Sequence, residues 1–255
     1  MTLSALLLSN STNQGSGYLA HADEVVDDFF TGITEITFVP YALADHDGYL
    51  ARVAPAFARH GIQMTSVHTS ADPARAIADA PAVYVGGGNT FRLTKALHRL
   101  NLIVALRDAT ASGTKYSGAS AGSNVASPSL RTTNDMPIVQ PASFETLGLL
   151  PFQLNCHYLD VDPTSTHAGE TRELRLAEFL EENNVAVLGL REGTWLRVEQ
   201  GDVRDAAAAP ATATIGGTAV NPSHGPAILF ERGQSPREVS GDASALLALN
   251  GTFDV

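Results

Sequence analysis

The stretch Gly118-Ala119-Ser120-Ala121-Gly122 constrains the fold of this chain more than any other feature. It follows the apolar-tending run Thr114-Lys115-Tyr116-Ser117 and opens a segment of small residues. A G-x-S-x-G pattern in this setting is typical of a sharp turn from a strand into a helix, where side chains beside the serine have no room. We therefore predict that Ser120 occupies such a turn, next to the free N–H groups of a helix N-terminus. The alternative is a turn of small residues that only packs a helix onto a sheet.

Short apolar runs alternate with helix-like segments along most of the chain. This order predicts an α/β fold with a mostly parallel sheet and helices on both faces, within a single domain of residues 1–255. The predicted strands are Leu3–Leu8, Ile36–Val39, Ile62–Val67, Ala82–Val85, Thr114–Ser117, Phe152–Cys156 and Val185–Leu190. The predicted helices are Tyr18–Phe30, Tyr49–His60, Pro73–Ala80, Thr90–Leu100 with Asn89 or Thr90 as its cap, Leu102–Ala111 and Glu170–Glu182. Short antiparallel strands are expected near the C-terminus at Trp195–Glu199, Ala211–Ile215, Ala219–Val220 and Ala227–Phe230, with Asp205–Pro210 as a loop.

Charge and cysteine content argue against several classes of protein. The formal net charge of −11 disfavours nucleic acid and anionic membrane surfaces as partners, because both require basic patches. Cys156 is the only cysteine, so neither an internal disulfide nor a cysteine-based zinc cluster is possible. No apolar run approaches the length of a membrane span, and the N-terminus does not resemble a signal peptide. We expect a cytoplasmic protein.

A serine hydroxyl needs a base before it can act as a nucleophile, and histidine is the usual one. Among the eight histidines, His157 follows the predicted strand Phe152–Cys156 at its carboxyl end, where open α/β sheets place their sites. His224, in a C-terminal turn, is the competitor, and His167 lies in a loop. Position favours His157. Consecutive strand residues point to opposite faces, so Cys156 is predicted to be a buried thiol.

Two acidic residues are candidates for orienting the histidine, and a glycine run is a candidate for binding negative charge. Glu192 follows the strand Val185–Leu190, whereas Asp135 lies in a polar loop beyond the serine turn; position favours Glu192. The run Gly86-Gly87-Gly88-Asn89 follows strand Ala82–Val85, so its N–H groups, with that of Ala121, can face the serine as an oxyanion hole. A phosphate-binding turn is the rival interpretation, but the last position of G-x-G-x-x-G is Phe91.

Several segments together resemble one family of serine peptidases, the family that contains peptidase E and cyanophycinase. The resemblance covers about the first four-fifths of the chain, and the segment Arg131–Val139, with sequence R-T-T-N-D-M-P-I-V, is its most specific part. The other matching segments are Leu6–Thr12, Val85–Phe91, the Ser120 turn, Asn155–His157, His167–Arg172 and Glu192–Trp195.

The resemblance implies a fold like that of class I glutamine amidotransferases, with serine in place of the cysteine of those enzymes. It also implies hydrolysis of dipeptides with an N-terminal aspartate, no metal or other cofactor, and a homodimer. Carried over by position, Ser120 is the nucleophile, His157 the base and Glu192 or Asp135 the acid. Gly88 and Ala121 supply the oxyanion hole.

Selectivity for aspartate requires a cation or several donors, because an unpaired buried carboxylate is very unfavourable. Arg131 and Arg172 are the candidate cations, and Arg131 is preferred because it lies in the most specific segment. Asn89, Thr132 and Thr133 are candidate neutral donors.

Three other functions remain open at the level of sequence. The first is a cyanophycinase-like or isoaspartyl hydrolase with the same machinery and a β-linked substrate. The second is an α/β-hydrolase esterase that uses Ser120, Asp162 and His224. The third is a ligand-binding relative that has lost catalysis.

Overall fold

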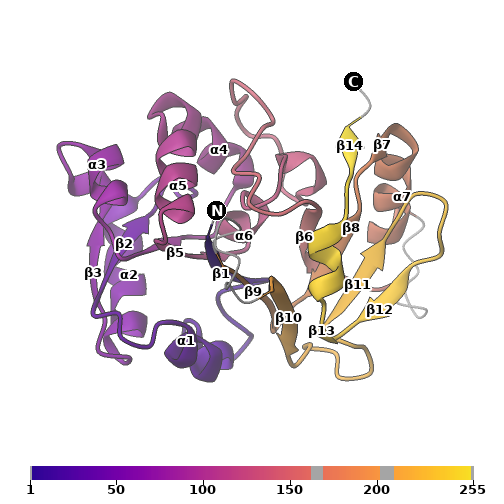
Figure 1. The fold of residues 1–255 in the computed structure, drawn as a ribbon, viewed down its shortest axis with the longest axis horizontal. Helices are drawn as coiled ribbons and strands as arrows, with labels where there is room; N and C mark the ends of the chain where they lie inside the picture. Colours follow the sequence, from indigo (N-terminus) through magenta and orange to yellow (C-terminus); the bar gives the residue numbers. More distant parts are fainter. Residues whose placement is uncertain (1, 162–168, 202–209, 254–255) are drawn as a thin grey trace.

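The computed structural model describes residues 2–161, 169–201 and 210–253. An eight-stranded sheet forms its larger part, in the order β13-β10-β9-β1-β5-β4-β2-β3 (Figure 1). Its five parallel strands are β1 (Leu3–Leu8), β2 (Glu35–Val39), β3 (Gln63–Ser66), β4 (Ala82–Val85) and β5 (Lys115–Ala119). The antiparallel edge consists of β9 (Thr194–Gln200), β10 (Thr212–Gly217) and β13 (Gly241–Asp242). The first five predicted parallel strands and two antiparallel edge strands, at Trp195–Glu199 and Ala211–Ile215, are confirmed in this sheet.

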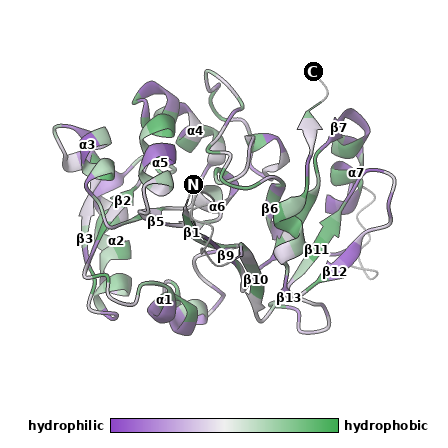
Figure 2. Ribbon diagram, in the orientation of Figure 1, coloured by the Kyte–Doolittle hydropathy of each residue, from purple (hydrophilic) through white to green (hydrophobic). Residues whose placement is uncertain are grey.

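Helices cover both faces of this sheet because its strands carry apolar side chains on both faces. In β1, Leu6 and Leu8 pack with helices α1 and α2, whereas Ala5 and Leu7 belong to the core beneath α3, α4 and α5. The helices are α1 (Asp23–Phe29), α2 (His46–Ala58), α3 (Pro73–Ala78), α4 (Thr90–Arg99) and α5 (Leu102–Ala111), with short 3-10 turns at Ala20–Ala22 and Val67–Thr69. In Figure 2 the outer helix α1 is largely hydrophilic, while the inner strand β11 is hydrophobic.

The C-terminal half departs from the single sheet that the sequence predicts. Three of its predicted strands, at Phe152–Cys156, Val185–Leu190 and Ala227–Phe230, belong to a second sheet in the order β12-β11-β8-β6 (Figure 1). Its strands are β6 (Gln153–Tyr158), β8 (Val187–Arg191), β11 (Ala227–Phe230) and β12 (Arg237–Val239), of which only β6 and β8 pair in parallel. The remaining elements are α6 (Ala121–Asn124), α7 (Arg172–Glu182), the pair β7 (Asn183–Asn184) and β14 (Thr252–Phe253), and 3-10 turns at Leu130–Thr132 and Ser244–Ala248.

The two sheets share one hydrophobic core. Leu154 of β6 and Leu188 of β8 pack in the same buried cluster as β1 and α5, while α7 covers the opposite face of the second sheet. Strands β8 and β11 are short apolar runs like those of the first sheet, so their sequences do not show which sheet they join. Ala219–Val220, predicted as a strand, forms none. His167, Asp162 and most of the predicted loop Asp205–Pro210 lie outside the described residues.

Within the described residues, no helix is both long enough and apolar enough to cross a bilayer.

Candidate active site

Ser120 occupies a strained turn between strand β5 and helix α6. Its backbone has φ 55° and ψ −112°, which an L-residue adopts only when its surroundings enforce it. The flanking glycines explain how the chain achieves this turn. A Cβ on Gly122 would lie 2.0 Å from the Val85 carbonyl oxygen, and a Cβ on Gly118 would lie 2.4 Å from the Gly122 carbonyl carbon. The predicted strand, tight turn and helix start are confirmed.

A methyl group added to this turn should strongly destabilise the folded protein. We expect Gly122→Ala to lower the free energy of unfolding by at least about 3 kcal/mol, because the Val85 carbonyl belongs to a central strand and cannot move away. Gly17→Ala is the matched control: a Cβ there meets only the Ala20 Cβ, at 3.9 Å, so the change should stay within about 0.5 kcal/mol. Urea unfolding of both variants measures the difference, and equal stabilities would contradict the steric explanation.

His157 approaches Ser120 from the second sheet. The distance between the His157 Nε2 and the Ser120 Oγ is 2.9 Å, and the imidazole is 38% exposed. His157 lies in a β-bulge of β6, with φ 55°. The competitor His224 instead faces Asp160, at 3.8 Å between its Nδ1 and the Asp160 Oδ1. The structure therefore brings together the serine and the histidine that position in the sequence favours.

Glu192 rather than Asp135 contacts the imidazole. The Glu192 Oε1 lies 2.6 Å from the His157 Nδ1, so a hydrogen-bonded chain runs from Glu192 through His157 to Ser120. The Asp135 Oδ2 accepts hydrogen bonds from the Thr90 N–H at 2.7 Å and from the Thr90 Oγ1 at 2.6 Å. Asp135 thus holds the first residue of α4, the helix that follows the glycine loop.

Cys156 is unsuited to nucleophilic attack. Its side chain is 1% exposed, and burial raises the pKa of its thiol far above the usual range. A buried neutral thiol is a poor nucleophile, because the reactive form is the thiolate. The predicted buried thiol is confirmed.

The glycine loop between β4 and α4 lies against the Ser120 turn. A Cβ on Gly87 would lie 3.1 Å from the Ser120 Cβ. Gly88 has φ 135°, and a Cβ there would lie 2.7 Å from the Ala42 carbonyl oxygen, so glycine alone fits. The Gly88 N–H has no acceptor in the described parts of the chain. The Ala121 N–H belongs to the first turn of α6, where amides have no partner within the helix.

The two candidate arginines have different surroundings. Arg131 is exposed, and its guanidinium stacks on two surface rings, with its central carbon 4.9 Å from the centroid of Phe253 and 5.8 Å from that of Phe144. Arg172 starts α7 and donates from its Nη1 to the Asn134 Oδ1 at 2.7 Å, and the Asn134 Nδ2 donates to the Cys156 carbonyl at 2.8 Å. Burial and then the nearby Arg175 lower the pKa of Arg172.

The three candidate neutral donors are engaged within the protein. Asn89 caps α4: its Oδ1 accepts from the Arg92 N–H, and its Nδ2 donates to the Met136 carbonyl at 2.8 Å. Thr132 is buried and donates its only hydroxyl proton to the Leu154 carbonyl, which rules against the predicted role as a substrate donor. The Thr133 Oγ1 donates to the Thr90 Oγ1 and to Asp135.

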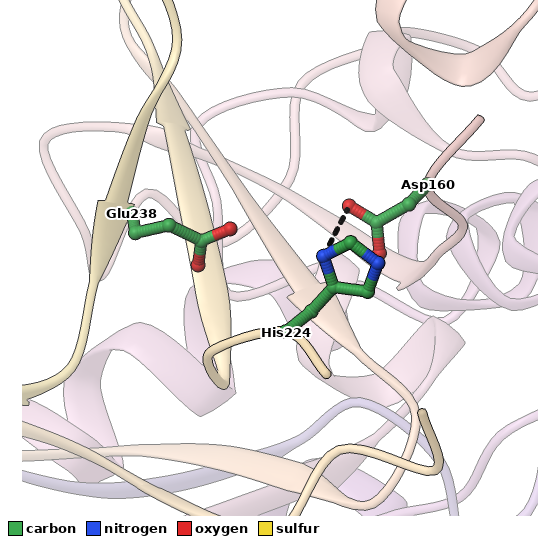
Figure 3. A group of neighbouring side chains, drawn as sticks. All are labelled: Asp160, His224 and Glu238. Atoms are coloured by element: carbon green, nitrogen blue, oxygen red, sulfur yellow. Dashed lines mark ion pairs between the residues drawn. The ribbon is translucent and has the colours of Figure 1, made fainter. Parts of the chain in front are cut away.

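Three potential metal ligands gather at the end of the second sheet. Asp160, His224 and Glu238 each offer a ligand atom within 4.8 Å of the others (Figure 3). However, the buried guanidinium of Arg191 donates to both carboxylates, at 2.6 and 2.7 Å to Asp160 and at 2.7 and 2.8 Å to Glu238. Partial burial opposes ionisation of Asp160, but these hydrogen bonds outweigh it and hold the pKa of this carboxyl below its usual value. The group is therefore a salt-bridge network in which the Arg191 guanidinium supplies the positive charge that a bound metal ion would supply.

Two residues that link the sheets at this site were not among the predicted site residues. Ser9 and Asn10 directly follow β1. The Ser9 Oγ accepts from the His157 N–H at 2.9 Å, and the Asn10 Oδ1 accepts from the Gly193 N–H at 2.8 Å. Two signals were available: a polar pair at the carboxyl end of a buried strand, and the place of both residues in the matching segment Leu6–Thr12.

A strained serine, an imidazole and a carboxylate in one hydrogen-bonded chain, carried by an α/β fold, define a serine-type hydrolase. Comparison with known proteins narrows this class. The family model for peptidase family S51 matches residues 5–206. This chain belongs to peptidase family S51, and it is a peptidase.

Curated relatives and solved structures agree with this assignment. Peptidase E of Streptomyces coelicolor is 57% identical over 254 residues, covering 99% of this chain and 98% of the relative. A probable alpha-aspartyl dipeptidase of Drosophila melanogaster is 47% identical over 197 residues, covering 76% of this chain and 82% of the relative. The crystal structure of a peptidase from an acI-B1 Actinobacterium superposes with a TM-score of 0.63 at 15% identity, covering 96% of this chain and 97% of that chain, which supports the fold.

Proposed function

We propose that this protein is a serine dipeptidase that hydrolyses Asp-Xaa dipeptides through an acyl-enzyme on Ser120. The observation that carries the proposal is the chain of hydrogen bonds from Glu192 through His157 to Ser120, at 2.6 and 2.9 Å. The names of the relatives, peptidase E and alpha-aspartyl dipeptidase, support the substrate class.

The mechanism follows from the roles of these three side chains. The Ser120 Oγ attacks the peptide carbonyl while the His157 Nε2 accepts its proton, and the same imidazolium then protonates the leaving amine. Glu192 holds the imidazole in the tautomer with a proton on Nδ1 and stabilises the imidazolium. The N–H groups of Gly88 and Ala121 stabilise the oxyanion. Water, activated by the same histidine, releases aspartate from Ser120.

A cavity beside this chain of hydrogen bonds offers room for the residue that follows aspartate in the substrate. A cavity of about 330 Å³ borders Glu192, with Tyr158, Arg191 and His224 among its lining residues. We propose that the residue after aspartate extends toward this cavity, while its leaving amine takes the proton from the His157 Nε2 beside Ser120.

Arg172 is the cation that we assign to the substrate's β-carboxylate. We expect Arg172→Met to lower kcat/KM for Asp-Leu by about 30- to 1,000-fold, the effect of removing one partner of a desolvated ion pair worth about 2–4 kcal/mol. Hydrolysis of Ala-Leu should change little. Arg131→Met is the matched control and should leave both substrates unaffected, because Arg131 stacks on Phe144 and Phe253. A larger effect of the Arg131 variant would reverse the assignment.

The proposed activity is tested by comparing Asp-Leu, Asn-Leu and Ala-Leu with the purified wild-type protein. Equal rates on all three would refute aspartate selectivity. Assays with α-Asp-Arg and with β-Asp-Arg distinguish the proposed dipeptidase from a cyanophycinase-like or isoaspartyl hydrolase. The esterase alternative predicts that His224→Ala abolishes turnover, whereas our proposal predicts this for His157→Ala, because His157 is the histidine in contact with Ser120.

Three further properties belong to the proposal. We infer a fold related to class I glutamine amidotransferases, supported by a nucleophile at a strand-to-helix turn in a parallel sheet. We also infer a homodimer in the cytoplasm. No metal or other cofactor enters the mechanism, because the triad itself supplies the nucleophile, the base and the acid.

A further inference from the structure

The backbone that carries His157 interrupts the pairing of strands β6 and β8. In this parallel ladder Cys156 pairs with Leu190 and Tyr158 pairs with Arg191, so His157 is an extra residue without a partner. Its φ of 55° is unfavourable for any residue other than glycine, by roughly 1–3 kcal/mol. The conformation that presents the imidazole therefore depends on contacts from outside the strand pair.

One of those contacts is a hydroxyl group from the other sheet. The Ser9 Oγ accepts the His157 N–H at 2.9 Å and donates to the Leu190 carbonyl at 2.9 Å. The hydroxyl thus sits between two strands and replaces the ladder hydrogen bond that the bulge breaks. Ser9 is fully buried, and its own N–H donates to the Thr194 carbonyl at 2.9 Å, so its backbone is held as well.

The next residue makes a similar contact at the other end of the site. The Asn10 Oδ1 accepts the N–H of Gly193 at 2.8 Å, directly after Glu192. Gly193 has φ 89°, and a Cβ there would lie 2.3 Å from the Thr218 carbonyl oxygen. The two residues after β1 therefore contact both backbone segments that carry the histidine and the acid: the bulge of β6 and the turn between β8 and β9.

We propose that Ser9 is a positioning residue: its hydroxyl, inserted into the β6–β8 ladder, holds the His157 bulge so that the imidazole meets the Ser120 hydroxyl. Ser120 and His157 lie on different sheets, so their separation depends on how the sheets are joined. Misplacement by about 1 Å can cost about 100-fold in rate. This inference rests on the proposed function, because it assumes that His157 activates Ser120.

The test compares Ser9→Ala with Ser127→Ala. The control is matched: Ser127 is also fully buried, and its Oγ accepts the Leu154 N–H at 2.8 Å on the same strand, β6, three residues before His157. Both variants therefore lose a buried hydroxyl that supports β6. Thermal unfolding, kcat and KM on Asp-Leu, and the rate at which a fluorophosphonate labels Ser120 are measured for each.

We expect Ser9→Ala to lower kcat and the labelling rate by about 10- to 100-fold with KM within about twofold. For Ser127→Ala, kcat, KM and the labelling rate should each stay within about twofold of the wild type. Its melting temperature should fall about as much as that of Ser9→Ala. If Ser9→Ala does not fold, Ser9→Cys replaces it, because the thiol keeps the side-chain length and weakens both hydrogen bonds. The same drop in kcat is expected.

The outcomes separate this inference from the proposed function. Normal labelling of the wild type with equal effects of the Ser9 and Ser127 variants would overturn the positioning role and leave the serine mechanism intact. Failure of the wild type to be labelled at Ser120 would overturn the serine mechanism, and the positioning role with it.

Discussion

Ser120→Ala is expected to lower kcat on Asp-Leu by at least about 10⁴-fold, because no other described side chain could take the place of the nucleophile. The hydroxyl of Ser123, three residues along the chain, is buried and hydrogen-bonds the Leu8 and Gly118 carbonyls at 2.7 and 2.8 Å. Steady-state kinetics of the purified variant, with circular dichroism to show that it is folded, measure the effect.

Ser123→Ala is the matched control for this substitution. It removes a hydroxyl three residues further along the chain and should leave kcat within about threefold, since its hydrogen-bond partners are the Leu8 and Gly118 carbonyls and the Cys156 thiol, none of which takes part in the reaction. A Ser120 variant that retains a tenth of the wild-type kcat would show that the nucleophile lies elsewhere.

Glu192→Gln should lower kcat by about 10³- to 10⁴-fold while the protein remains folded. The amide keeps the shape of the side chain, but its NH₂ group favours the wrong imidazole tautomer and its neutral charge no longer stabilises the imidazolium. Glu192 is 39% exposed, so its neutralisation leaves no buried charge unpaired. Single-turnover kinetics show whether acylation is the affected step.

Asp135→Asn distinguishes the two acids that the sequence left open. Asp135 receives the Thr90 N–H and hydroxyl at the start of α4, so its substitution should cost about 1 kcal/mol of stability, as for other capping residues. We expect less than about a tenfold change in kcat. A loss of activity in this variant that equals the loss in Glu192→Gln would contradict the assignment of the acid.

Local patterns were sufficient for many elements of the first sheet. The predicted bounds of Leu3–Leu8, Ala82–Val85 and Leu102–Ala111 agree with the structure, because a short apolar run or an amphipathic stretch is read from its own residues. The Ser120 turn was also predictable, since its glycines are required by contacts within a few residues and with the neighbouring strand.

The membership of strands in two sheets was not predictable by the same means. The run at β8 resembles those of the first sheet, and β6 mixes polar and apolar residues, so neither sequence shows which sheet its strand joins. The bulge at His157 was also missed, since it depends on a hydroxyl 148 residues away in the sequence. The stacking of Arg131 on Phe253, which leads us to propose Arg172 instead, was not predictable for a related reason: the sequence shows which arginine lies in a specific segment, but not what its guanidinium contacts.

By itself, the sequence determined the residue types available for chemistry and the local shape of the serine turn, because these depend on composition and on steric contacts between near neighbours. The tertiary structure alone decided that Glu192 and not Asp135 meets the imidazole, that Arg172 hydrogen-bonds Asn134 while Arg131 stacks on Phe253, and that Ser9 contacts the bulge at His157. Each of these depends on packing between distant segments, and the free energy of that packing comes from contacts that no short window of sequence contains.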